Sequence, residues 1–234
     1  MPIANICHSG NAGDIIYAMP TFKTFGKVNL FLIKSQQTSI QIFEALIPLL
    51  KSQDYINDVE YFNGQRIDFD FDRFREIGGV SNNSLPITFM NLYQRYFNLS
   101  NPWLTVEQNT LSDIVISRTT RYPGVLDYRK ALSKFRDKCI FVGLDDEYEN
   151  FVKNYGFLRF APTKTLLESA KIISGAKFFL GNQSVNLAIA EGLKIPRFVE
   201  TSQDCPNCIP IGYGAHSSWG YEDVVEIIEK YLCH

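Results

Sequence analysis

Residues 3–20 read IANICHSGNAGDIIYAMP. The stretch holds a short apolar run, a loop with two glycines, and a second apolar run that begins after Asp14. A strand, a glycine-containing loop and a helix in this order are typical of a βαβ unit, from which parallel sheets are built. We therefore predict a strand at 3–7 and a helix from residue 15, which Pro20 should end or kink before residue 25.

The same alternation continues along the whole chain. Apolar runs of strand length alternate with stretches of helix length on both sides of a turn-rich segment at 78–109. Strands are predicted at 28–33, 59–62, 67–71, 113–117, 140–144, 176–180 and 196–200, and helices at 39–50, 88–97, 146–155, 165–174, 184–193 and 221–232. The sequence thus predicts an α/β fold of two Rossmann-like parallel-sheet lobes, 1–105 and 106–234, that face a central cleft. The last helix could also pack back on the N-terminal lobe.

The composition is that of an ordinary globular protein. Of 234 residues, 45% are hydrophobic and 21% are charged, so a large core can form. The formal net charge of -2 disfavours nucleic acid and anionic lipid as partners. No targeting segment is visible, and no apolar run is long enough to span a bilayer. Five scattered cysteines suit a reducing compartment, so we expect a cytoplasmic protein.

The loop after the first strand is the first candidate site. Parallel sheets bind ligands at the carboxyl ends of their strands, and Gly10 and Gly13 would let a ligand approach the backbone beside Asn11. Asp14 stands at the start of the helix, where it could line the cleft or merely cap the helix. The loop matches neither the dinucleotide fingerprint nor the Walker A pattern.

Arginines follow the first strand of the second half. Arg118 and Arg121 could clamp a diphosphate through paired hydrogen bonds, or they could be ordinary surface arginines. Their position after a strand favours a ligand role.

A third group of polar residues lies around the helix predicted at 184–193. Asn182, Gln183 and Ser184 precede this helix, where they could face an anion or only cap the helix. Glu191 lies about two turns into it and could hold a ribose or point to water. Cys205 and Cys208 form a single C-x-x-C pair, whereas a structural zinc site needs four ligands, so no metal is predicted.

Taken together, these segments resemble the GT-B glycosyltransferases, and among them the heptosyltransferase-like branch, glycosyltransferase family 9. Residues 10–20 are similar to that family's Gly-Asp pair followed by apolar residues and a proline. Residues 165–196 resemble its C-terminal signature, in which a Gly-Asn-Asp-Ser-Gly loop joins a strand to a helix that ends before a proline. The chain departs from this signature at Gln183, Val185 and Ala188, where the family has Asp, Gly and His.

The resemblance implies a transferase that moves a sugar from a nucleoside diphosphate sugar to an acceptor hydroxyl, with inversion and without a metal or other cofactor. Asp14 would be the general base, in a loop near both substrates formed by Gly10, Asn11 and Gly13. The donor would be held by Arg118, Arg121, Asn182, Gln183, Ser184 and Glu191. The acceptor would be a glycan, with modified viral DNA less favoured because charges in the first lobe nearly cancel.

Two other functions stay open. The departures at the donor loop favour a non-catalytic protein that binds a nucleotide sugar or phosphate on the same fold. A nucleotide-sugar epimerase would keep a similar donor site. The presence of Asp14 favours sugar transfer over binding alone.

Overall fold

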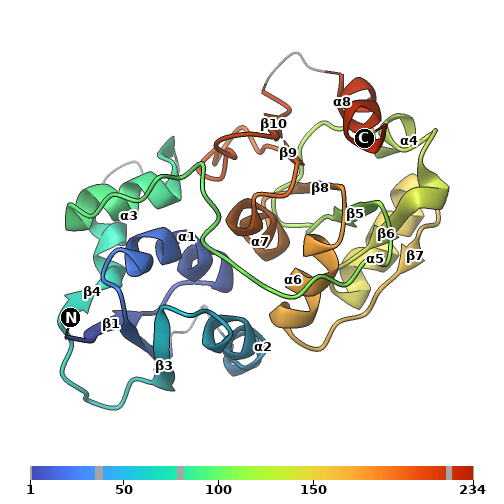
Figure 1. Ribbon diagram of the computed structural model, residues 1–234. Helices are drawn as coiled ribbons and strands as arrows, with labels where there is room; N and C mark the ends of the chain where they lie inside the picture. The colour runs from blue at the N-terminus through green and yellow to red at the C-terminus, as the bar shows by residue number, and fades with distance from the viewer. Residues whose placement is uncertain (1, 35–38, 78–81, 220–222, 234) are drawn as a thin grey trace.

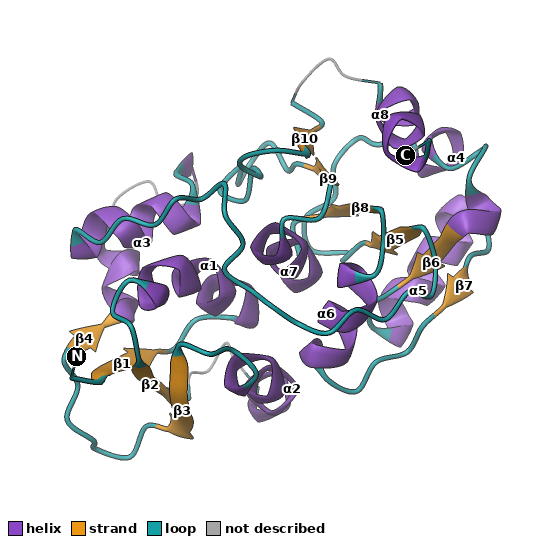
Figure 2. Cartoon of the chain, viewed as in Figure 1, coloured by secondary structure: helices purple, strands orange, loops and turns teal. Residues whose placement is uncertain are grey.

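Two separate parallel sheets, one in each half of the chain, form the fold (Figure 1, Figure 2). The computed structural model describes residues 2–34, 39–77, 82–219 and 223–233. The predicted turn residues 78–81 and the first two residues of the predicted helix at 221–232 lie outside this description. The expected architecture of two parallel-sheet α/β lobes is confirmed.

The first sheet has the strand order β3-β2-β1-β4, and all neighbours run parallel. Its strands are β1 (Ala4–His8), β2 (Val28–Leu32), β3 (Ile56–Tyr61) and β4 (Phe69–Asp70). The lobe's helices are α1 (Ala12–Lys23), α2 (Ile40–Lys51), the 3-10 helix η1 (Phe71–Glu76) and α3 (Leu85–Tyr93). Alternate strand residues such as Leu30 and Val59 join the buried side chains of α1 and α2 in one core, because successive strand residues point to opposite faces.

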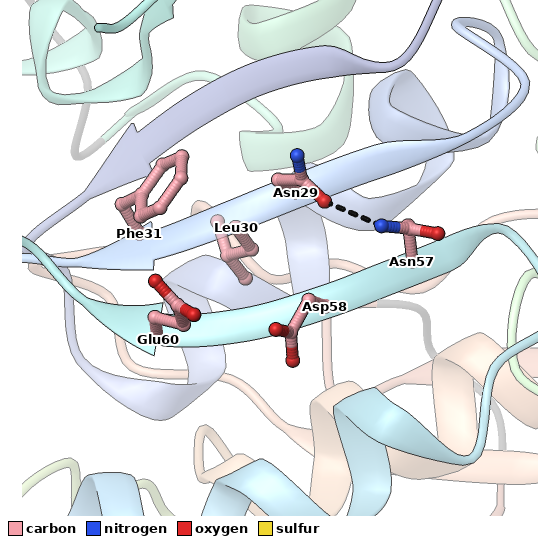
Figure 3. Close-up of a pocket in the computed structure, with 6 residues that line it drawn as sticks. All are labelled: Asn29, Leu30, Phe31, Asn57, Asp58 and Glu60. Atoms are coloured by element: carbon pink, nitrogen blue, oxygen red, sulfur yellow. Dashed lines mark hydrogen bonds between the residues drawn. The ribbon is translucent and has the colours of Figure 1, made fainter. Parts of the chain in front are cut away.

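The other face of this sheet carries a row of asparagines. Asn57 donates from Nδ2 to Asn29 Oδ1 over 2.8 Å, and Asn29 donates to Asn5 Oδ1 over 3.0 Å. A cavity of about 240 Å³ lies along this row; its lining is Asn29, Leu30, Phe31, Asn57, Asp58 and Glu60 (Figure 3). Amides that bond one another allow polar side chains on part of this face, whereas most parallel sheets are hydrophobic on both faces.

The second sheet has the order β10-β9-β8-β5-β6-β7 and is also parallel throughout. Its strands are β5 (Ile114–Ser117), β6 (Cys139–Phe141), β7 (Arg159–Phe160), β8 (Phe178–Asn182), β9 (Arg197–Glu200) and β10 (Ala215–Ser217). Its helices are α4 (Tyr128–Ala131), η3 (Arg136–Lys138), α5 (Asp145–Tyr155), α6 (Leu166–Ser174), α7 (Val185–Leu193) and α8 (Val224–Leu232). None of the helices described is both long enough and apolar enough to cross a bilayer.

The last helix packs on its own lobe. Val224, Ile227 and Ile228 of α8 belong to the hydrophobic cluster that contains Phe178 of β8 and Tyr128 of α4. The suggestion that this helix packs back on the N-terminal lobe is therefore wrong.

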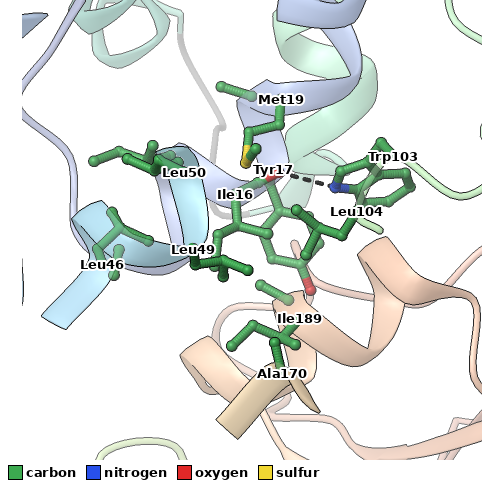
Figure 4. Close-up of a cluster of buried hydrophobic side chains, with 14 of the residues drawn as sticks. Ile16, Tyr17, Met19, Leu46, Leu49, Leu50, Trp103, Leu104, Ala170 and Ile189 are labelled. Carbon is green, nitrogen blue, oxygen red and sulfur yellow. Dashed lines mark hydrogen bonds between the residues drawn. The ribbon is translucent and has the colours of Figure 1, made fainter. Parts of the chain in front are cut away.

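The two lobes meet along packed helices. α1 lies beside α7 and α2 beside α6 (Figure 1), and buried side chains of both lobes form one continuous cluster (Figure 4). The chain between α3 and β5 is hydrogen-bonded to both lobes at this junction. The amides of Trp103 and Leu104 donate to the carbonyl of Gly192 in α7, and the Tyr55 hydroxyl donates to the Trp103 carbonyl.

α1 continues past Pro20 and ends at Lys23, before residue 25, so the proline itself lies inside the helix. Proline has no N–H, which leaves the carbonyl of Ile16 one turn earlier without its helical donor. The indole Nε1 of Trp103 donates to that carbonyl over 3.1 Å (Figure 4). A side chain 87 positions along the chain thus replaces the missing bond.

Candidate functional site

The loop between β1 and α1 is held by side chains at three consecutive amides. The amide of Ser9 donates to Asp72 Oδ1 (2.8 Å), that of Gly10 to His8 Nδ1 (2.9 Å), and that of Asn11 to Asp14 Oδ2 (3.0 Å). In a phosphate-binding nest the corresponding N–H groups point at the anion instead. This loop is therefore suited to placing a side chain and not to cradling a phosphate.

Gly10 is the tightest point of the loop. A Cβ on Gly10 would lie 2.5 Å from His8 Cε1 and 2.8 Å from Asp14 Cβ, closer than real side chains approach. A Cβ on Gly13 would lie 3.9 Å from the Cα of Val185, the first residue of α7. The loop thus faces the N-terminus of α7 across the junction between the lobes.

Asp14 caps the helix, which is one of the two roles that its sequence position allowed. It is the third residue of α1, and its Oδ2 accepts the Asn11 amide in a capping box. Its side chain is half-buried, and burial raises its pKa. His8, the Asn11 amide, Arg75 and Arg121 act on that pKa in the opposite direction. A carboxyl group influenced by charges from both lobes is a candidate general base.

Positive charge faces Asp14 from the C-terminal lobe. Arg121 is exposed on the loop after β5, and its charge lowers the pKa of both Asp14 and Glu147. Ser184 caps α7 by accepting the amide of Leu187, which leaves the positive end of the helix dipole at the junction. These two features could together hold an anionic group.

Arg118 points into its own lobe. Its Nε and NH2 groups donate to the Glu200 carboxylate over 2.9 Å and 3.3 Å. The Tyr128 hydroxyl and the Gly124 amide also donate to this carboxylate. Arg118 and Glu200 are only 8% and 0% exposed, so they form a buried ion pair. The expectation that Arg118 clamps a diphosphate is corrected by this internal partner.

Asn182 and Gln183 hold the loops that follow β5 and β9. Asn182 is fully buried, accepts the Thr119 amide and donates to the carbonyls of Thr119 and Tyr122. Gln183 donates to the carbonyl of Cys205. These bonds fix the loops after β5 and β9, so the role of both side chains is to hold the loops that border the candidate site.

Glu191 is bound inside its lobe as well. Its carboxylate accepts from Lys194 over 2.6 Å, from Arg197, and from the Ile211 amide over 3.2 Å. Because Glu191 is 2% exposed, a ribose could not reach it without breaking this cluster. The expectation of a donor contact at Glu191 is therefore corrected to a structural role.

Glu147 is a further candidate for the site, which the sequence analysis interpreted only as part of a helix start. It lies in the first turn of α5, beyond the end of β6, and accepts the Leu144 amide over 3.0 Å. Burial raises its pKa, while the Leu144 amide, the Thr119 hydroxyl and Arg121 lower it. The acidic run at 145–147 was interpreted only as a helix start. Its place after a parallel strand was the signal that could have found it.

Two thiols border Asp14 on the loop after β9. Asp14 contributes to the raised pKa of both Cys205 and Cys208, and burial is the main cause in each. The pKa of Cys208 reaches about 12. The thiols therefore stay protonated and neutral near neutral pH.

Comparison with known proteins gives structural matches only. No family model and no curated protein matches the chain. The glycosyl transferase family 9 protein from Veillonella parvula DSM 2008 aligns with a TM-score of 0.65 and 10% identity, over 99% of this chain and 97% of that one. E. coli heptosyltransferase WaaC with ADP-2-deoxy-2-fluoro heptose aligns with a TM-score of 0.60 and 9% identity, over 99% of both chains. E. coli ADP-heptose lps heptosyltransferase II gives 0.57 and 13%, over 100% of this chain and 99% of that one.

One further match, the dodecameric glycosyltransferase TibC from enterotoxigenic E. coli H10407, is iron-containing. It aligns with a TM-score of 0.54 and 14% identity, over 91% of this chain and 61% of TibC. Within the residues described above, no three His, Cys, Asp or Glu side chains gather as metal ligands. At these identities the likeness concerns architecture: the chain has the two-lobed fold of the heptosyltransferase and glycosyltransferase family 9 structures.

Proposed function

We propose that this protein is a glycosyltransferase that moves a sugar from a nucleoside diphosphate sugar to a hydroxyl group of a glycan, with inversion at the anomeric carbon. The observation that carries the proposal is Asp14, an ionisable side chain opposite the first turn of α7 and under the influence of charges from both lobes. The fold supports the donor class, because WaaC was solved with an ADP-sugar analogue.

Asp14 would act as the general base. Among the described residues, its carboxylate is hydrogen-bonded at Oδ2 by the Asn11 amide, which leaves Oδ1 for an acceptor hydroxyl. As Asp14 takes the proton, the hydroxyl oxygen attacks the anomeric carbon, and the bond from that carbon to the diphosphate breaks. The bonding electrons leave with the diphosphate, which gains negative charge.

The C-terminal lobe would stabilise that charge. Arg121 can donate to phosphate oxygens, and the N-terminus of α7, capped by Ser184, lies on the same side of the cleft. These groups perform the task that a divalent cation performs in metal-dependent transferases. We therefore propose a metal-independent GT-B reaction.

The ribose of the donor would be held by Glu147. Its half-buried carboxyl group borders the same loop as Arg121, whereas Glu191 is occupied by Lys194 and Arg197. A carboxylate in this position can accept hydrogen bonds from two neighbouring hydroxyl groups.

A cytoplasmic location is part of the proposal. All five cysteines are free thiols, which supports a reducing compartment. Nucleotide sugars supplied in such a compartment would reach the cleft directly.

Thermal unfolding in the presence of single nucleoside diphosphates and their sugars tests the donor site. One diphosphate should raise the unfolding midpoint, since a ligand at 100 times its Kd adds about 2.7 kcal/mol to stability. An unchanged midpoint with every diphosphate, in a cooperatively folded protein, would contradict the proposal. A raised midpoint without sugar transfer to any acceptor would instead support the non-catalytic binding protein.

A further inference from the structure

His8, the last residue of β1, lies wholly inside the N-terminal lobe. Its side chain is fully buried. The centre of its ring is 6.3 Å from that of Phe71, 5.7 Å from that of Phe74 and 5.6 Å from that of Phe89. Among the described residues, no group forms a hydrogen bond with its Nε2 atom. The ring is thus surrounded by apolar side chains, which disfavour a charge on it.

The other ring nitrogen of His8 holds the loop that follows β1. Nδ1 accepts the Gly10 amide over 2.9 Å and lies 3.5 Å from Asp72 Oδ1. One nitrogen cannot accept from Gly10 and donate to Asp72 at the same time. Asp72 Oδ1 already accepts the Ser9 amide over 2.8 Å and Arg75 NH1 over 2.7 Å, so it needs no further donor. The shorter contact with Gly10 therefore decides the arrangement: Nδ1 has no proton, and the proton is on Nε2.

The same ring packs beside Asp14 at Gly10. A Cβ on Gly10 would lie 2.5 Å from His8 Cε1 and 2.8 Å from Asp14 Cβ, so both side chains border the space that the glycine leaves open. The next amide, that of Asn11, donates to Asp14 Oδ2 over 3.0 Å. A displacement of Gly10 would therefore reach Asp14 through this contact and through the backbone.

We propose that His8 is a positioning residue, whose uncharged ring accepts the Gly10 amide and thereby holds the loop that places Asp14 in the cleft. His8 touches none of the reacting atoms and acts through Gly10. Its catalytic meaning rests on the proposed function, whereas its hydrogen bond to Gly10 does not.

Protonation of His8 would break this arrangement. An imidazolium ring carries a proton on both nitrogens, so Nδ1–H and the Gly10 N–H would be two donors facing each other over 2.9 Å. Burial alone would raise the pKa of Asp72, but its contacts with His8 and Ser9 hold that pKa well below its usual range. Asp72 is therefore an anion, and the new proton would turn to it. The loop has one arrangement for the neutral ring and another for the charged ring.

The groups that face His8 come from four elements. The charged ones are Asp14 of α1 and the ion pair of Asp72 with Arg75 on η1. Apolar side chains are presented by β2, where Leu32 is the strand partner of His8, and by α3, which carries Phe89. The two acids attract a proton to the ring, and the apolar groups oppose it.

Histidine 15N NMR tests the inference on the wild type. The chain has three histidines, and His8→Asn identifies the resonances of His8. At neutral pH, correlations between the ring protons and nitrogens should show a proton on Nε2 and none on Nδ1. A proton on Nδ1 would overturn the proposal.

Two substitutions separate the hydrogen bond from the volume of the ring. In His8→Asn the side-chain Oδ1 can replace Nδ1 as the acceptor of the Gly10 amide, whereas His8→Leu fills the space without an acceptor. Hydrogen exchange of the Gly10 amide should become roughly 2- to 10-fold faster in His8→Leu, the effect of one hydrogen bond, and return toward the wild-type rate in His8→Asn. The Ser9 amide, which donates to Asp72, is the control within the same loop and should keep its rate. Equal Gly10 rates in all three proteins would contradict the proposal.

The pH dependence gives a readout that a purely structural role would not change. As the pH falls, the Gly10 amide resonance of the wild type should shift with the same midpoint as the His8 ring, and this shift should be missing in His8→Asn. His216→Asn makes the same substitution on β10 of the other lobe and is the matched control, so it should leave the Gly10 titration unchanged. A Gly10 resonance that does not follow His8, or that loses its shift in His216→Asn as well, would overturn the proposal.

Once a donor is known, the pH profile of kcat adds a second measurement. The loss of activity toward acid should involve two protons in the wild type, one on Asp14 and one on His8, but a single proton in His8→Asn, while KM for the donor stays constant. Identical acidic limbs would remove His8 from the reaction. If the wild type transfers no sugar, the proposed function fails, yet the NMR titration still decides the role of His8.

Discussion

Asp14 accepts the Asn11 amide at Oδ2 and, in the proposed reaction, takes a proton from the acceptor. The substitution Asp14→Asn separates these two roles. In Asp14→Asn the side-chain oxygen can still accept the Asn11 amide, so the start of α1 should be kept. The amide cannot take a proton, so kcat should fall by roughly 10²- to 10⁴-fold. Sugar transfer and the nucleotide-induced rise in unfolding midpoint, measured on the same sample, check this. A variant that keeps wild-type turnover would remove Asp14 from the reaction.

Arg118 and Arg121 are three residues apart, but substitution by alanine should affect stability at the first and diphosphate binding at the second. Arg118→Ala leaves Glu200 buried without its cation, which should lower the free energy of unfolding by about 3–5 kcal/mol. Arg121→Ala should leave stability unchanged but weaken binding of the diphosphate by roughly 10- to 100-fold, since a bond to a charged group contributes about 1.5–3 kcal/mol. Urea unfolding and nucleotide titration of both variants distinguish the two roles. Equal effects would contradict the assignment.

These two arginines also show how far a sequence can locate a site. A strand followed by a polar residue marks the carboxyl edge of a parallel sheet, and Asp14, Arg121 and Ser184 were predicted in this way. Their roles stay predictions. The direction of a side chain depends on partners that are distant in the chain. Arg118 turns inward because it pairs with Glu200, which lies 82 positions away in the chain. No local sequence pattern predicts that pair.

Among the elements, α1 depends for its continuity on Trp103, which lies in the chain between α3 and β5. In Trp103→Phe the ring still fills the junction, but the Ile16 carbonyl loses its donor, which should cost about 1–3 kcal/mol. Pro20→Ala restores an N–H to that carbonyl. The double variant should therefore lose less stability than the sum of the two single changes, as measured by urea unfolding. Strict additivity would argue against the replacement of the helical bond by the indole.

Hydrophobic periodicity predicted the longer elements well. The buried strands β2 and β5 and the helices α6 and α7 were expected within a few residues of their observed bounds. The edge strands β7 and β10, of two and three residues, are too short for any period to be visible. The position of Pro20 inside α1 could not be predicted from periodicity, because the bond that replaces the missing helical donor comes from Trp103, outside the helix.

For the whole molecule, the shared core predicts that the lobes unfold together. Trp103 is fully buried at the junction, and the chain has one other tryptophan, Trp219. In a Trp219→Phe variant, fluorescence reports the junction alone, while far-UV circular dichroism reports both lobes. The two urea curves should coincide, as in two-state unfolding. A fluorescence transition at lower urea would show that the junction opens before the lobes unfold.

The bonds made by the loop after β1 also limit how this chain can vary over evolutionary time. Three successive backbone N–H groups each have their own side-chain acceptor. Inserting or deleting one residue there would shift every donor away from its acceptor, so the length of the loop is constrained. The side chains of Ser9 and Asn11 are constrained as well, because the Ser9 hydroxyl accepts from Arg75 and the Asn11 side chain accepts a backbone amide in the capping box of α1. The loop therefore fixes where Asp14 stands by its length and its hydrogen bonds together.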